Sequence, residues 1–145
     1  MKKKILIVIA SYYNDIALNL SKNTQRYLNL QSIKNCKKIE VPGVFEIPVT
    51  ISKRIKNFDG FIALGCVIRG ETSHYEYVWS ESARALMNLS LEGIAIGYGI
   101  LTVENYNQAL VRSKTIANKG FGKGKVAALA CINQINLKIK YTDGS

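Results

Sequence analysis

The residues best suited to chemistry lie in one short stretch of the chain, from Gly65 to His74. An apolar run, Phe61 to Ile68, is typical of a buried strand and ends in Arg69 and Gly70. The residues that follow resemble a helix N-terminus, where free backbone N–H groups and the helix dipole bind anions. His74, the only histidine, belongs to the first turn of this predicted helix. The pattern predicts a phosphate site beside one titratable imidazole, and hence chemistry on a small phosphorylated molecule.

The spacing of apolar residues predicts alternating strands and helices that position this stretch. Continuous aliphatic runs are typical of parallel strands buried on both faces, whereas apolar residues three or four apart are typical of helices. The predicted strands are Ile5–Ala10, Lys38–Val41, Phe61–Ile68 and Ile94–Tyr98. The predicted helices are Ile16–Leu30, Phe45–Ile55, Ser73–Leu91, Thr102–Ala117 and Val126–Lys140. This order predicts an α/β fold over residues 1–145, a single-domain three-layer α/β/α sandwich with a four-stranded parallel sheet, flavodoxin-like.

In open α/β sheets, ligands bind beyond the carboxyl ends of the strands. Four segments lie there in the predicted fold and are expected to converge on one crevice: Ser11 to Asp15, Pro42 to Glu46, Arg69 to His74 and Tyr98 to Thr102. The aromatic rings of Tyr13, Phe45 and Tyr98 suit a flat heterocycle, and the Glu46 carboxylate suits a polyol. Each has a simpler structural role as well; Glu46, for example, is also a first-turn carboxylate that the helix dipole favours.

Composition restricts the class of protein. The formal net charge is +10, which favours nucleic acid or anionic small molecules, but the lysines are scattered and no aromatic–basic pattern of an RNA-binding sheet is present. Cys36, Cys66 and Cys131 lack metal-ligand spacing, so free thiols and a reducing compartment are predicted, with no metal site. No run is long enough to span a membrane, and the apolar residues after Met1 are interpreted as a strand, so a cytoplasmic protein with no membrane partner is expected.

Four segments in chain order resemble the 6,7-dimethyl-8-ribityllumazine synthase family of riboflavin biosynthesis. They are VPGVFEIP at 41–48, GCVIRGETSHYEYV at 65–78, GILTVEN at 99–105 followed by Gln108, Ala109 and Arg112, and NKG at 118–120. The first two are long and specific, whereas the last is weaker alone. Together they cover nearly the whole chain.

The resemblance implies an enzyme that condenses 5-amino-6-(D-ribitylamino)uracil with 3,4-dihydroxy-2-butanone 4-phosphate to the lumazine, the penultimate step of the pathway. Phosphate and water are released, and neither a metal nor an organic cofactor takes part. It also implies a homopentamer with sites between subunits, small-molecule substrates and no nucleic acid partner.

The resemblance also implies roles for particular residues. His74 matches the proton-transfer residue, and Tyr13 the aromatic ring that stacks on the pyrimidine. Val44, Phe45 and Glu46 match the segment that holds the ribityl chain, with Glu46 as acceptor. The remaining matches are Cys66, Val67 and Ile68 along the ring pocket, Gly70, Glu71 and Thr72 in the phosphate turn, and Tyr98, Arg112 and Lys119 from a neighbouring subunit, Arg112 at the phosphate.

The chain departs from the family pattern at a few points. Tyr13 replaces a commoner Phe or Trp, and Tyr98 a commoner Phe; both keep a ring and add a hydroxyl. The stretch between Arg112 and Lys119 is one residue shorter than in shell-forming members, and the first strand begins almost at Met1. These departures predict a pentamer, or a pair of pentamers, rather than an icosahedral shell.

Two other classes of protein stay open at this point. A flavodoxin-like module that binds a flavin has a phosphate loop after its first strand, but the segment Ser11–Asn14 contains no glycine. A nucleic-acid-binding protein is suggested by the net charge alone. The motifs favour the enzyme over both.

Overall fold

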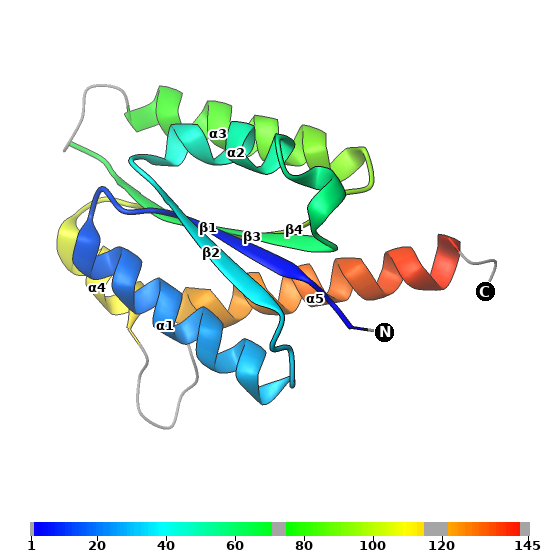
Figure 1. The fold of residues 1–145 in the computed structure, drawn as a ribbon. Helices are drawn as coiled ribbons and strands as arrows, with labels where there is room; N and C mark the ends of the chain where they lie inside the picture. The colour runs from blue at the N-terminus through cyan, green and yellow to red at the C-terminus, as the bar shows by residue number, and fades with distance from the viewer. Residues whose placement is uncertain (1, 71–74, 115–121, 143–145) are drawn as a thin grey trace.

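The computed structural model describes residues 2–70, 75–114 and 122–142 (Figure 1). Its strands are β1 (Ile5–Ala10), β2 (Cys36–Val41), β3 (Gly60–Ile68) and β4 (Ala95–Val103). Its α-helices are α1 (Asn14–Leu30), α2 (Ile47–Ser52), α3 (Tyr75–Leu91), α4 (Tyr106–Ser113) and α5 (Gly122–Thr142). Two 3₁₀ turns, Val44–Glu46 and Ile55–Asn57, flank α2.

The four strands form one parallel sheet in the order β2-β1-β3-β4. Helices α1, α4 and α5 cover one face and α2 and α3 cover the other, so the three-layer α/β/α arrangement predicted from the sequence is confirmed (Figure 1). All residues of β1 and β3 are buried, as expected for central strands with helices on both faces. The strand ends that ligands approach in such sheets therefore lie along one edge.

Helix α5 packs unusually close to the sheet, and glycines make this possible. A Cβ added at Gly97 of β4 would overlap the carbonyl oxygen of Ala127 in α5. At Gly99 it would lie 2.8 Å from the Ala127 Cβ, and at Gly60 of β3 2.7 Å from the Cys131 sulfur. Small residues at the crossing let the helix and the sheet backbones approach each other.

Several element boundaries differ from the prediction, and two of them, the end of β4 and the start of α4, lie close to the predicted site. Strand β4 continues to Val103, because its pairing with β3 extends to the partners Ile68 and Val103. Helix α4 accordingly begins later, at Tyr106, where the Asn105 side chain caps it by accepting the Gln108 N–H at 2.9 Å.

The predicted helix Phe45–Ile55 is also interrupted. Only Ile47–Ser52 is α-helical, with Pro48 in its first turn, where a missing N–H is tolerated. The 3₁₀ turn ahead of it ends at Glu46 and carries the residues of the predicted ribityl segment.

Within the described residues, no helix combines the length and apolar character needed to cross a bilayer.

Candidate active site

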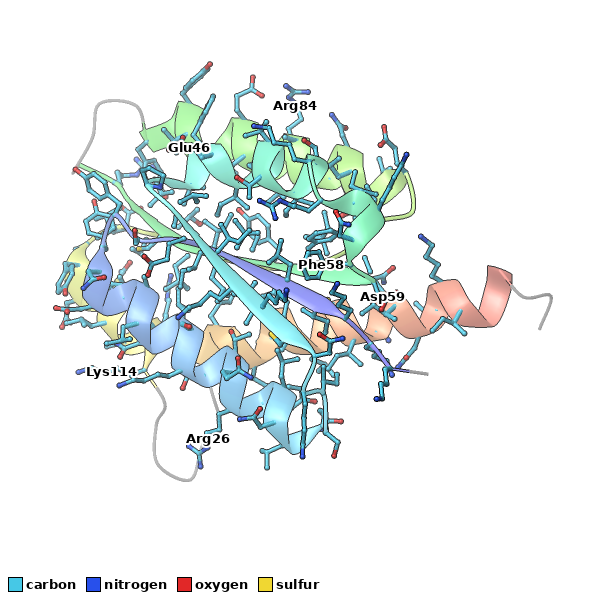
Figure 2. The ribbon with its side chains drawn as sticks, viewed as in Figure 1. Arg26, Glu46, Phe58, Asp59, Arg84 and Lys114 are labelled. Carbon is cyan, nitrogen blue, oxygen red and sulfur yellow. The ribbon has the colours of Figure 1, made fainter. Side chains whose placement is uncertain are left out.

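A cavity of about 210 Å³ lies where β1, β2 and β3 end. Figure 2 places Glu46 at this edge of the sheet, opposite the end that carries Phe58 and Asp59. Six predicted residues line the cavity: Tyr13, Val44, Phe45, Cys66, Val67 and Ile68. Three segments far apart in sequence therefore meet, as the order of strands predicted, and their mostly apolar surfaces suit a flat ring.

Two tyrosines form the wall at the end of β1. Tyr13 is half-buried and precedes α1, where its carbonyl accepts the Ala17 N–H at 2.9 Å. The exposed ring of Tyr12 meets the Tyr13 ring edge to face, with 4.9 Å between centroids and 75° between planes. Such a contact limits the orientations open to the Tyr13 ring.

The wall at the end of β2 is a tight turn closed by Glu46. Its Oε1 accepts the backbone N–H of Gly43 at 3.1 Å, while its own N–H donates to the Gly43 carbonyl at 3.2 Å. This reciprocal pairing holds Val44 and Phe45 between the two residues. The second carboxylate oxygen, Oε2, takes no part in this pairing. Glu46 can therefore stabilise the turn through Oε1 and accept a hydrogen bond from a ligand through Oε2.

The end of β3 forms the floor of the cavity. Burial raises the pKa of the Cys66 thiol to about 12. The group is therefore neutral at physiological pH and offers no thiolate for nucleophilic attack. Cys66 acts in this wall as a small apolar residue, in line with its predicted place beside the ring.

Arg69 joins the rim of the cavity to two neighbouring elements. Its Nη2 lies 3.2 Å from Glu76 Oε1 in α3, and its Nε lies 3.4 Å from Glu104 Oε2 after β4. Its guanidinium also lies 5.4 Å from the centre of the Tyr75 ring. All of these charges are exposed, so each pair stabilises the fold only slightly. Together they fix the two flanks of the predicted phosphate turn, Gly70 and Tyr75.

Two predicted residues lie away from the cavity of their own chain. Tyr98 lies inside β4, not at its end, because the strand continues past it; burial raises the pKa of its hydroxyl, with Tyr75 nearby. Arg112 lies exposed in the last turn of α4. The expectation that the segment Tyr98–Thr102 follows a strand is therefore wrong, since all five residues belong to β4.

Four of the predicted residues, Glu71, Thr72, His74 and Lys119, lie outside the described residues. Gly70 is described and has a φ of +85°, which favours glycine over any other residue there. Of the predicted phosphate turn, Gly70 alone belongs to the described residues.

Three residues of the cavity wall were not singled out as site residues from the sequence: Tyr12 and Gly43, which lie within the predicted crevice segments, and Val78. Tyr12 and Gly43 adjoin predicted residues, so the ends of the strands were sufficient to find them. Val78 comes from the first turn of α3, and only the packing of that helix over β3 brings it to the cavity.

The chain matches a family model. The model for 6,7-dimethyl-8-ribityllumazine synthase matches residues 2–139.

Individual relatives agree with the model and align over most of both chains. The chain is 45% identical to the 6,7-dimethyl-8-ribityllumazine synthase of Zymomonas mobilis over 139 residues, 94% of this chain and 97% of the relative. It is 42% identical to that of Novosphingobium aromaticivorans over 131 residues, 89% and 94% of the two chains. It is 44% identical to that of Bartonella tribocorum over 149 residues, 99% and 96% of the two chains.

Proposed function

Because this chain belongs to the 6,7-dimethyl-8-ribityllumazine synthase family, we propose that the cavity at the ends of β1, β2 and β3 is the place where it performs the family's reaction. The enzyme condenses 5-amino-6-(D-ribitylamino)uracil with 3,4-dihydroxy-2-butanone 4-phosphate to 6,7-dimethyl-8-ribityllumazine. Phosphate and water are released, and the step is the penultimate one of riboflavin biosynthesis. The observation that carries the placement is the convergence of six motif residues on one cavity.

The pyrimidine ring stacks on Tyr13 above the floor of Cys66, Val67 and Ile68. The ribityl chain follows the turn at Val44 and Phe45, with its hydroxyl groups on Glu46. The phosphate of the ketone binds at Gly70, Glu71 and Thr72. Tyr98, Arg112 and Lys119 serve the site of a neighbouring subunit, which agrees with the position of Tyr98 and Arg112 outside their own cavity.

Chemistry begins when a ring amine attacks the ketone and forms an imine with loss of water. Elimination of phosphate and rearrangement of the side chain leave a carbonyl group, and the second amine condenses with this carbonyl to close the ring with loss of a second water. Both partners are reactive, so holding them in contact contributes most of the acceleration. His74 moves protons between the amines, the hydroxyl groups and water.

Glu46→Gln is expected to raise the Kd of the pyrimidine about fivefold and to leave the Kd of the ketone unchanged. Glutamine keeps one oxygen for the Gly43 N–H, so the turn survives, but its other end is a donor instead of an acceptor. Calorimetry on each substrate measures the two affinities. Unchanged pyrimidine binding would reduce Glu46 to its role in the turn.

His74→Ala is expected to lower kcat by about 10²-fold at most, the low end for acid–base catalysis, with both KM values little changed. The reason is that positioning of the two partners survives the loss of the imidazole. Steady-state kinetics at saturating substrates measure the loss. Activity indistinguishable from the uncatalysed rate, in an oligomer of normal mass, would show that proton transfer dominates.

The enzyme is a homopentamer, as the resemblance to the family implies, and an apolar face beside the cavity supports an association between copies. Phe45 lines both the cavity and a second hollow between α2 and α3. There its ring stacks on Tyr77 at 5.6 Å between centroids and 22° between planes. The same layer exposes Val49 at 50%, Met87 at 58% and Leu91 at 78%. Large apolar side chains exposed along one layer of a fold are typical of surfaces that a second copy covers.

Light scattering on the purified protein is expected to give five times the 16.1 kDa mass of one chain, or twice that for paired pentamers. Tyr77→Glu is expected to shift the mass downward, because it puts a charge into the apolar face. Leu30→Glu is the matched control, because Leu30 is an exposed apolar residue at the far end of α1. This variant is expected to leave the mass unchanged. Hollow spherical particles would contradict the pentamer, and a fully active monomer would contradict the shared site.

Mixing the two substrates with purified protein tests the function itself. Lumazine absorbance and inorganic phosphate are expected to appear together in equal amounts, without added metal. A flavin-binding module would instead hold a flavin and form no product, and the family match does not favour it. One catalytic domain acting in the cytoplasm is part of the same proposal.

A further inference from the structure

A third tyrosine, Tyr106, stands beside the wall formed by Tyr12 and Tyr13. Its ring centroid lies 6.5 Å from that of Tyr13, with 56° between the planes. Tyr12 contacts Tyr13 as well, at 4.9 Å. The Tyr13 ring is therefore held between two others, one from its own loop and one from α4.

Tyr106 is itself held in place by the start of its helix. It is the first residue of α4, directly after the Asn105 cap. The Gln108 side chain closes this end a second time, since its Oε1 accepts the Glu104 N–H at 2.8 Å. These bonds fix the direction in which the Tyr106 side chain leaves the helix.

The other end of the side chain is held by α1. The Tyr106 hydroxyl donates to Asp15 Oδ2 at 3.3 Å, across 91 positions of sequence. The pKa of Tyr106 is raised, by desolvation first and then by the Asp15 carboxylate, so the hydroxyl keeps its proton as the donor. Asp15 lies two residues after Tyr13, and the bond therefore ties α4 to the turn that carries Tyr13.

We propose that Tyr106, anchored by Asp15, is a positioning residue that holds the Tyr13 ring in the orientation that stacks on the pyrimidine. The proposal rests on the stacking role of Tyr13 given under Proposed function. Tyr106 does not line the cavity, so it acts through Tyr13 and not by touching the substrate. Its influence is expected on the binding of the pyrimidine, because its contacts are with the Tyr13 ring and with Asp15.

Four variants measure this role: Tyr106→Phe, which removes the hydroxyl; Tyr106→Leu, which removes the ring; Asp15→Ala; and the double variant of Tyr106→Phe with Asp15→Ala. We expect the Kd of the pyrimidine to rise about threefold in Tyr106→Phe. In Tyr106→Leu we expect it to rise about tenfold, because this variant loses an aromatic contact. KM for the ketone and kcat stay within about twofold, a split that general destabilisation does not produce. The double variant is expected to bind the pyrimidine no more weakly than either single variant, because both substitutions remove the same Tyr106–Asp15 hydrogen bond.

Tyr27→Phe is the matched control, because it removes a hydroxyl from α1, the helix that carries Asp15, at a position that does not line the cavity. The Kd of the pyrimidine in this variant is expected to equal that of the wild type. Tyr13→Ala separates the proposal from its premise. If Tyr13→Ala raises the Kd of the pyrimidine while the Tyr106 variants do not, the role proposed for Tyr106 is wrong but the stacking role of Tyr13 is supported. If Tyr13→Ala has no effect, the stacking role itself is wrong. If the Tyr106 variants weaken both substrates equally with a lower Tm, Tyr106 is only a structural residue and the proposal is overturned.

Discussion

Replacing Arg112 with alanine is expected to raise KM for the phosphorylated ketone by about 10²- to 10³-fold and KM for the pyrimidine by about twofold at most. A guanidinium can offer a phosphate two parallel charge-assisted hydrogen bonds, and their loss leaves the anion without its partner. Among the described residues Arg112 forms no ion pair, so its charge is free for a ligand. Initial rates with each substrate varied in turn measure the split.

Lys114→Ala is the matched control for this change. It removes the same charge from an exposed position two residues later (Figure 2). The control separates a local contact from a general loss of positive potential, because the potential is lowered equally by both variants. Equal increases in both KM values after Arg112→Ala, or the same effect from Lys114→Ala, would contradict the assignment of Arg112 to the phosphate.

Gly97→Ala is expected to lower the free energy of unfolding by about 3 kcal/mol, as a severe case of overpacking. The added Cβ overlaps the Ala127 carbonyl oxygen and lies 2.8 Å from its carbonyl carbon, and neither backbone can yield without moving α5. For a chain of this size the loss corresponds to a Tm lower by about 6–12 °C. Urea and thermal unfolding at one fixed protein concentration measure it, because association also contributes to stability.

Gly43→Ala is the matched control for Gly97→Ala. Its Cβ would meet only Glu46 Oε1, at 3.4 Å, and its backbone is extended. We expect a change in unfolding free energy within about 0.5 kcal/mol. A Gly97→Ala protein as stable as the wild type would show that α5 can shift away from β4 at little cost.

The sheet could be predicted from the sequence because its strands are defined by local pattern. Strand β1 has the predicted bounds, and β3 begins one residue before them, since their aliphatic runs are long and uninterrupted. In β4 the run is interrupted by Gly97 and Gly99, which locally favour a turn. What keeps these glycines in the strand is the pairing of β4 with β3, where Gly97 lies opposite Ile62 and Gly99 opposite Leu64, and that is a contact between distant segments.

The cavity could be predicted only in part for a similar reason. Its residues at the ends of β1, β2 and β3 belong to motifs, so their types and their place at one edge were sufficient. The three contacts of Arg69 and the bond between Tyr106 and Asp15 join residues from different strands and helices. Exposed charges and hydroxyls of this kind have no periodic pattern, and only the folded chain shows which partner each one meets.

Mixed oligomers of two variants, Tyr13→Ala and Arg112→Ala, test most directly whether the reaction takes place in a site shared by two subunits. Each variant alone is expected to be nearly inactive at low substrate concentration. In an equal mixture assembled together, a site is intact when its Tyr13 comes from one variant and its Arg112 from the other, which random assembly gives in about one quarter of sites. We therefore predict recovery of about a quarter of the wild-type rate of lumazine formation after mixing. A mixture no more active than its two components would contradict the shared site, because it would place Tyr13 and Arg112 in the same subunit's pocket.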